Sequence, residues 1–262
     1  MSVHLVGGGR DQEATAAVYG TFLTEAAQRA ESMGRAVPRI GVVLVADADD
    51  LAGGVDWFRL ALTSCGPVEV VAVTAESLGA LCLDDGSAPA ARWWSDLDGL
   101  LVGGGLTPAY HRVLQPHAVA IRIAVTDGLP YAGFSAGAMI APRRALLGGW
   151  QLGSTAVTHQ DNAEDLDQLT VVDGLGLISS TVEVHTSQWG TLSRLVAAVA
   201  AGVASSGIAV DENTVAILDP ATDGPATGGA SVTVLGTGQA WLLTAGEGSS
   251  VRVDRREPDR TR

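Results

Sequence analysis

Short apolar runs rich in β-branched residues alternate with helical stretches through the first half of the chain, and this alternation constrains the fold most. Buried strands are predicted at residues 4–6, 40–46, 68–73, 97–102 and 130–134. Helices are predicted at residues 12–32, 57–63 and 116–123. Strands and helices in this order are typical of parallel strands joined by crossover helices. The sequence therefore predicts an α/β protein with a doubly wound, mostly parallel sheet.

The second half of the chain is less regular. Residues 147–158 resemble a hairpin, and the acidic stretch 161–168 is interpreted as a surface loop or short helix rather than a binding feature. A strand is predicted at 182–185 and a helix at 192–203, followed by antiparallel strands at 208–210, 215–218, 231–235 and 239–243. The sheet should thus gain an antiparallel C-terminal extension. We expect one α/β domain over residues 1–253 and a charged, disordered tail over 254–262.

The charged residues exclude several classes of function. The chain of 262 residues has a formal net charge of −13, and every basic residue other than histidine is an arginine. Without lysine there is no P-loop lysine and no Schiff-base attachment of a cofactor. The acidic balance disfavours nucleic acid as a partner, since phosphates repel carboxylates.

Other features of the composition bear on location and on metals. No run approaches the roughly 18 apolar residues of a membrane helix, and no signal peptide is visible, so we expect a cytoplasmic protein without a membrane partner. Cys65 and Cys82 lack the spacing of a metal site or a disulfide framework, and we expect both in the core. Neither a metal nor a cofactor is predicted.

The most informative segment for chemistry joins the strand at 130–134 to a small-residue helix predicted at 136–141. Ser135 lies between Gly133 and Gly137 in the pattern G-x-S-x-G. A sharp turn at such a junction lifts the serine Oγ out of the sheet, and the flanking glycines allow close backbone packing. The next amide, that of Ala136, then lies at a helix N-terminus, where it favours negative charge. The pattern predicts a nucleophile with an oxyanion donor; the alternative is a serine that merely caps the helix.

Two glycine triplets follow predicted strands. Residues 103–105 end the strand at 97–102, so the amides of Gly104 or Gly105 can supply a second oxyanion donor at the same edge of the sheet. Residues 7–9 follow the first strand and are expected to line the rim of the site. Neither triplet fits the G-x-G-x-x-G dinucleotide pattern.

A serine nucleophile needs a base, which is usually histidine. His4, His111 and His117 are expected to have structural or solvated roles, which leaves His159 in a polar loop and His185 at the end of a strand. His185 is favoured because that strand end should share the edge with the serine. For the acid that orients the base, the residues leave several alternatives open: Glu183, the segment 211–213, and the loop acids Asp161, Glu164 and Asp165.

The chain resembles the serine peptidases that include cyanophycinase and the α-aspartyl dipeptidases, a family with the flavodoxin-like fold of the class I glutamine amidotransferases. The resemblance spans nearly the whole chain and rests on L-V-G-G-G at 5–9, G-L-L-V-G-G-G at 99–105, G-F-S-A-G-A at 133–138, G-L-G-L at 174–177, V-H at 184–185 and G-I-A-V-D-E-N-T at 207–214. It implies a triad of Ser135, His185 and Glu212, with oxyanion donors from Ala136 and from Gly104 or Gly105. It also implies hydrolysis of a small peptide, isopeptide or amide bond, and a homodimer. Serine in place of the cysteine of the amidotransferases disfavours glutamine-amide transfer.

The substrate-binding positions depart from that family. Its members carry Asn-Gln after the second glycine triplet, where this chain has Leu106 and Thr107, and several arginines after the histidine, of which only Arg194 remains. Arg194, Arg143 and the neighbouring Arg144 are candidate carboxylate anchors, with Trp189 as an apolar wall and Thr107 as a further substrate-binding residue. The missing arginines disfavour cyanophycin or an aspartyl dipeptide as substrate. They also leave an esterase or acyltransferase on the same triad, or a binding protein that has lost catalysis, as alternatives.

Overall fold

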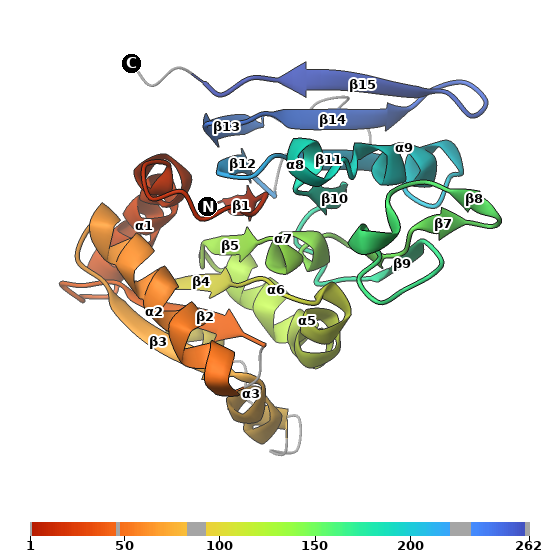
Figure 1. Ribbon diagram of the computed structural model, residues 1–262. Helices are drawn as coiled ribbons and strands as arrows, with labels where there is room; N and C mark the ends of the chain where they lie inside the picture. Colours follow the sequence, from red (N-terminus) through yellow and green to blue (C-terminus); the bar gives the residue numbers. More distant parts are fainter. Residues whose placement is uncertain (1, 46–47, 83–92, 221–231, 260–262) are drawn as a thin grey trace.

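The computed structural model describes residues 2–45, 48–82, 93–220 and 232–259 (Figure 1). A seven-stranded sheet forms its centre, with strands in the order β13-β12-β1-β5-β4-β2-β3. The five parallel strands are β1 (Val3–Val6), β5 (Tyr131–Phe134), β4 (Gly99–Val102), β2 (Arg39–Leu44) and β3 (Glu69–Thr74). At one edge, β12 (Thr214–Leu218) pairs antiparallel with β1, and β13 (Thr233–Gly236) pairs antiparallel with β12. The predicted mostly parallel α/β sheet with added antiparallel strands is confirmed.

Helices cover both faces of this sheet because successive strand residues point to opposite sides. One face is packed by α1 (Thr15–Ser32) and α2 (Ala48–Cys65), through residues such as Phe22 and Phe58. The other is packed by α3 (Ala75–Cys82), α5 (Thr107–Leu114), α6 (Ala118–Thr126) and α7 (Ala136–Ile140), through residues such as Tyr110 and Ile121. In β4, Leu101 packs in the core on the side of α1 and α2, whereas its neighbours Leu100 and Val102 pack in the core on the opposite face. The sheet is therefore doubly wound, and its strand ends converge at one edge.

A second sheet of four strands contains most of the C-terminal region, in the order β10-β11-β14-β15. These strands are β10 (Thr181–Val184), β11 (Ser206–Val210), β14 (Ala240–Ala245) and β15 (Val251–Arg256), with α8 (Thr186–Trp189) and α9 (Leu192–Ala200) between the first two. β10 and β11 pair parallel, whereas the remaining pairs are antiparallel. The predicted antiparallel strand at residues 208–210 is present, since β11 pairs antiparallel with β14, but its other neighbour in the sheet, β10, pairs parallel with it. A strand–helix–strand unit joins the two, and such a unit returns the chain in the same direction.

The remaining elements are short. After α7 the chain forms β6 (Arg144–Gly148) and β9 (Thr170–Asp173), which pair with each other. Between them lies a hairpin of β7 (Gln151–Leu152) and β8 (Thr155–Ala156). Two single 3₁₀ turns are η1 (Gln115–His117) and η2 (Gln160–Asn162). The predicted hairpin within 147–158 is present. Within the described part of the chain, no helix is long and apolar enough to span a membrane.

Two predictions about individual segments need correction. Residues 254–256, expected in a disordered tail, form the end of β15, where Arg256 pairs with Ala240; residues 260–262 lie outside the described part. Cys65 is half-buried at the edge of a core rather than within it, and the side chain of Cys82 is outside the described residues. His117, for which a structural or solvated role was expected, is buried, and burial lowers its pKa.

Candidate active site

Ser135 occupies the sharp junction between β5 and α7. Its backbone has φ 52° and ψ −110°, a conformation that an L-residue adopts only under strain. A Cβ on Gly133 would lie 2.5 Å from the carbonyl oxygen of Gly137, and a Cβ on Gly137 would lie 2.2 Å from that of Val102. Only glycine fits at both positions. The Ser135 side chain makes no capping hydrogen bond to the helix, so the alternative of a simple helix cap is wrong.

His185 and Glu212 extend from Ser135 in a hydrogen-bonded chain. His185 Nε2 lies 2.9 Å from Ser135 Oγ, and His185 Nδ1 lies 2.7 Å from Glu212 Oε1. With the Nδ1 proton donated to Glu212, Nε2 is left to accept from the serine hydroxyl. The two residues follow β10 and β11, and these strands pair parallel with Val184 opposite Val210. Parallel pairing thus carries both side chains to the same end of the second sheet.

The imidazole of His185 is enclosed. The indole of Trp189 stacks on it with ring centres 3.8 Å apart and an angle of 6° between the planes. Gly8 lies against it so closely that a Cβ there would be 2.1 Å from Cε1. Burial lowers the pKa of His185, and the hydrogen bond that His185 donates to Glu212 opposes this only in part. His185 is therefore neutral at pH 7 and can accept a proton.

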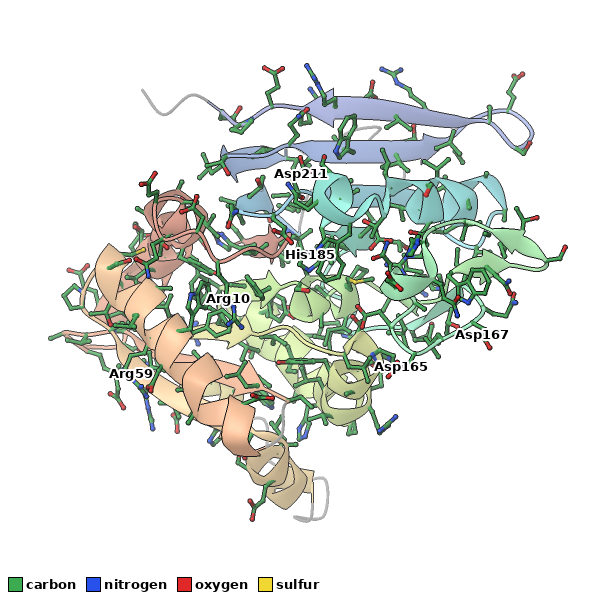
Figure 2. All side chains as sticks on the ribbon, in the orientation of Figure 1. Arg10, Arg59, Asp165, Asp167, His185 and Asp211 are labelled. Carbon is green, nitrogen blue, oxygen red and sulfur yellow. The ribbon has the colours of Figure 1, made fainter. Side chains whose placement is uncertain are left out.

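The other candidate acids do not contact His185. Asp211 is buried, and its carboxylate accepts hydrogen bonds from the amide and hydroxyl of Ser187 and from the amide of Gln239 (its place beside His185 is visible in Figure 2). These contacts join β11, α8 and β14. The Glu212 amide donates to Gln188 Oε1. Asp211 therefore anchors the loop that carries Glu212.

Backbone amides surround Ser135 where an oxyanion would form. The Gly104 backbone lies beside the serine, since a Cβ on this glycine would be 2.8 Å from Ser135 Cβ. Within the described residues, no carbonyl or side-chain oxygen accepts a hydrogen bond from the amides of Gly104, Gly105 or Ala136. The carbonyl of Gly104 accepts from Tyr110 Oη at 3.0 Å, and burial raises the pKa of that phenol to about 12. The tyrosine thus fixes the loop that presents these amides.

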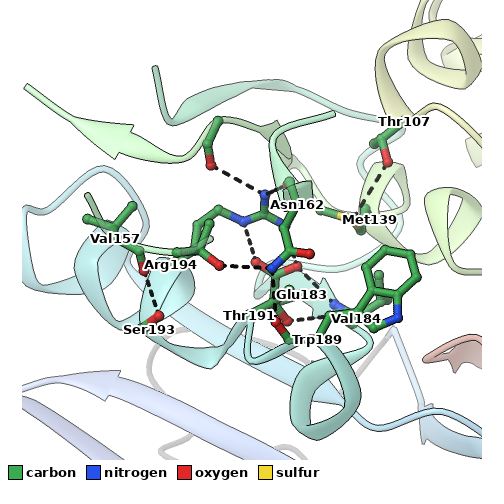
Figure 3. A network of polar contacts seen from close by, with 12 residues as sticks. Thr107, Met139, Val157, Asn162, Glu183, Val184, Trp189, Thr191, Ser193 and Arg194 are labelled. Atoms are coloured by element: carbon green, nitrogen blue, oxygen red, sulfur yellow. Dashed lines mark hydrogen bonds and ion pairs between the residues drawn. The ribbon is translucent and has the colours of Figure 1, made fainter. Parts of the chain in front are cut away.

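Arg194 is not the free carboxylate anchor that we expected. Only 2% of its surface is exposed, and its guanidinium makes a two-pronged ion pair with Glu183 at 2.7 and 2.8 Å (Figure 3). It also donates to the carbonyl oxygens of Gly149 and Asn162. Asn162 in turn donates from Nδ2 to the carbonyl of Trp189. Arg194 and Glu183 therefore hold the loop and helix around Trp189, and neither reaches the substrate side of the triad.

The remaining predicted anchors also lie apart from the triad or are occupied. Arg143 is exposed after α7, and Arg144 forms an exposed ion pair with Asp173 at 3.0 Å. The Thr107 side chain is fully buried, with its hydroxyl 3.7 Å from Met139 Sδ, so it does not line the site. Of the five residues predicted to bind substrate, only Trp189 borders the triad.

A cleft of about 670 Å³ adjoins the triad at Trp189. Its lining consists of Leu106, Trp150, Gln160, Asp161, Asn162, Ala163, Glu164, Asp165, Leu166, Asp167 and Trp189. The acidic stretch 161–168 is a surface loop that begins in a 3₁₀ turn, as expected, and it forms a wall of the cleft. Its acids do not orient His185: Asp161 pairs with His159, and Glu164 accepts from the amide of Thr107.

The other histidines have separate partners. His4 is buried and lies 3.3 Å from Glu25, and His111 lies 2.8 Å from the carbonyl of Asp173. His159 is exposed at the far end of the loop. Among the described residues, no group of three or more His, Cys, Asp or Glu side chains is arranged to hold a metal ion.

Sequence reasoning missed Arg10, which follows the first glycine triplet. Its guanidinium lies over the indole of Trp57, 5.2 Å from the ring centre. The triplet itself lies at the rim of the site as expected, since Gly8 touches His185 and the Gly7 carbonyl accepts from the His185 amide. The position of Arg10 directly after this triplet was the available signal, because a residue that follows a loop at the rim of the site lies near the site.

Comparison with known proteins identifies a similar fold. No family model and no curated protein matches the chain. Among solved structures, a peptidase from an acI-B1 actinobacterium is similar with a TM-score of 0.58 and 18% identity, covering 94% of this chain and 95% of that one. A protein from Listeria monocytogenes EGD-e, provisionally named peptidase E, matches with a TM-score of 0.47 and 16% identity over 98% of both chains. The chain thus has a fold similar to that of the actinobacterial peptidase.

Proposed function

We propose that this protein is a serine-type peptidase or amidase that hydrolyses a small peptide or isopeptide bond. The observation that carries the proposal is the continuous chain from Ser135 Oγ through His185 to Glu212, with separations of 2.9 and 2.7 Å, at a strained strand-to-helix turn. A nucleophile, a base and an orienting acid in this order are the parts of a catalytic triad. The similarity in fold to a solved peptidase favours peptide bonds over other acyl substrates.

The reaction follows from the geometry. Ser135 Oγ attacks the carbonyl carbon, and its proton passes to His185 Nε2, while Glu212 stabilises the imidazolium through Nδ1. The carbonyl oxygen becomes an oxyanion and accepts hydrogen bonds from the amides of Ala136 and of Gly104 or Gly105. When the C–N bond breaks, His185 returns the proton to the leaving amine. A water molecule then gives its proton to His185 and attacks the acyl-enzyme, releasing the acid and restoring Ser135.

The surroundings of the triad support these roles. Burial lowers the pKa of His185, which keeps the base neutral at pH 7, and Trp189 together with Gly8 fixes the plane of the ring. The strained backbone at Ser135 exposes Oγ at the edge of the sheet beside amides that have no acceptor among the described residues.

Turnover of a panel of dipeptides and isopeptides tests the proposal. We expect the wild type to cleave at least one member, and Ser135→Ala and His185→Ala to lose that cleavage while remaining folded. If His185→Ala kept full turnover of a substrate that Ser135→Ala cannot cleave, the assigned base would be wrong. If the wild type cleaved aryl esters but none of the peptides, the proposed activity would be that of an esterase rather than a peptidase. Binding without any turnover would indicate a protein that has lost catalysis.

A further inference from the structure

Arg10 is held beside the triad by the backbone on either side of it. β1 and β5 are parallel neighbours with Val6 opposite Phe134, so the chain leaves both strands at the same edge of the sheet. Before Arg10, Gly8 lies against the His185 ring. After it, the amide of Asp11 donates to Asn213 Oδ1 at 3.0 Å, and the Asn213 amide donates to the Gly8 carbonyl at 2.7 Å.

The guanidinium is also positioned. It lies 5.2 Å from the centre of the Trp57 ring, and that ring is 5.7 Å from the ring of Phe134, the residue before Ser135. The positive charge of Arg10 also acts on Tyr110, whose hydroxyl donates to the Gly104 carbonyl. This charge lowers the pKa of the phenol and so opposes the effect of burial. Stacking on an indole restrains an arginine and leaves its donors free. Through Trp57 and Phe134, Arg10 is therefore fixed near the end of the strand that carries Ser135.

Arg10 has no carboxylate of its own in the described part of the chain. It is exposed and forms no ion pair there, although acidic residues outnumber basic ones by 29 to 16. The acids of the cleft lie on the other side of the triad: Figure 2 shows Arg10 on one side of His185 and Asp165 and Asp167 on the other. An anionic group on a substrate is thus repelled from the cleft and attracted to Arg10.

We propose that Arg10 binds the C-terminal carboxylate of the substrate's leaving group, so that the protein acts on short peptides with a free C-terminus. The inference rests on the proposed function. His185 gives its proton to the leaving amine, so the leaving group lies on the imidazole side of Ser135. Gly8 lies on that side, and Arg10 follows two residues later. A leaving group of one or two residues spans at most about 3.5 Å per residue, which confines its terminal carboxylate to this side.

Binding to the Ser135→Ala protein tests this inference without requiring turnover. The probes are alanyl-alanine, its C-terminal amide, and alanyl-glutamate α-amide, whose one carboxylate is in the side chain. We expect calorimetry to show that alanyl-alanine binds at least about tenfold more tightly than either amide. Adding Arg10→Gln should abolish this preference for alanyl-alanine. Arg10→Lys, which keeps the positive charge but loses the two-pronged donation of a guanidinium, should retain part of the preference. Arg59→Gln, which removes a charge from α2 where Arg59 pairs with Asp56, should leave it unchanged.

Several results would overturn the inference. These are no binding of alanyl-alanine at millimolar concentration, equal binding of the free acid and its amide, or a preference that survives Arg10→Gln in a folded protein. Binding of alanyl-glutamate α-amide as tight as that of alanyl-alanine would also overturn it, because Arg10 would then recognise a side chain. Failure of the proposed function is separate: it appears as an unreactive Ser135 in the wild type, whatever the peptides bind.

Discussion

Gly8→Ala is expected to disable Ser135 while leaving the protein folded. The new Cβ would lie 2.1 Å from His185 Cε1, whereas carbon atoms in contact are separated by about 3.5 to 4 Å. The imidazole would have to retreat by about 1.4 Å or more. Trp189, stacked 3.8 Å away, blocks retreat on its face of the ring. The hydrogen bonds to Ser135 and Glu212 would therefore lengthen or break.

The magnitude follows from this displacement. A misplacement of about 1 Å in a catalytic group costs about 100-fold in rate, so we expect the second-order rate of labelling of Ser135 by a fluorophosphonate to fall by at least about 100-fold. Backbone strain is the competing explanation, because Gly8 has φ +101°. Gly34→Ala is the matched control: its φ is +76°, and a Cβ there meets nothing within 4 Å. It should lose comparable stability and label at the wild-type rate. Wild-type labelling of a folded Gly8→Ala protein would refute the reasoning.

Three further outcomes are expected. Because burial lowers the pKa of His185 below its ordinary value of 6.5 and only the neutral ring accepts a proton, the acid limb of the kcat/KM profile should have its midpoint below pH 6.5; a midpoint above 6.5 would contradict this. Trp189→Ala should rehydrate the ring and move this acid limb to higher pH, and an unmoved limb would show that the stacked indole does not desolvate His185. Glu183→Gln should lower the free energy of unfolding by about 3 to 5 kcal/mol in denaturant titrations, because it leaves the Arg194 charge buried without its partner. The control is Asp173→Asn, at an exposed ion pair, which should change the free energy of unfolding by less than about 1 kcal/mol.

Four of the five parallel strands, β1, β2, β4 and β5, were predictable because they are buried on both faces and appear as apolar runs, whereas the edge strand β3 is largely half-buried or exposed. The helix α5 was missed although Pro108 lies in its first turn, where proline favours a helix start. In the second half, the order of residues 182–185, 192–203 and 208–210 contained the signal for parallel pairing, a strand, a helix and a strand. The prediction of antiparallel strands holds for β11 with β14, but it did not use this signal for β10 with β11.

Ser135 and His185 could be picked out because each follows a strand, although their strands, β5 and β10, belong to different sheets and not to one shared edge as expected. The orienting acid could not, since ranking Glu183 against Glu212 requires the pairing of β10 with β11, which local sequence does not contain. Arg194 was misjudged for a related reason. Its partner Glu183 lies eleven positions earlier on the neighbouring strand, and only the folded protein shows that the two are buried together.

The central claim is that Ser135 is a nucleophile activated by His185. Mass spectrometry of the intact, folded wild type after reaction with a fluorophosphonate tests it most directly, with peptide mapping to locate the adduct. We predict one adduct per chain, on Ser135, and none on Ser135→Ala. A folded wild type that forms no adduct, or forms it on another residue, would contradict the claim.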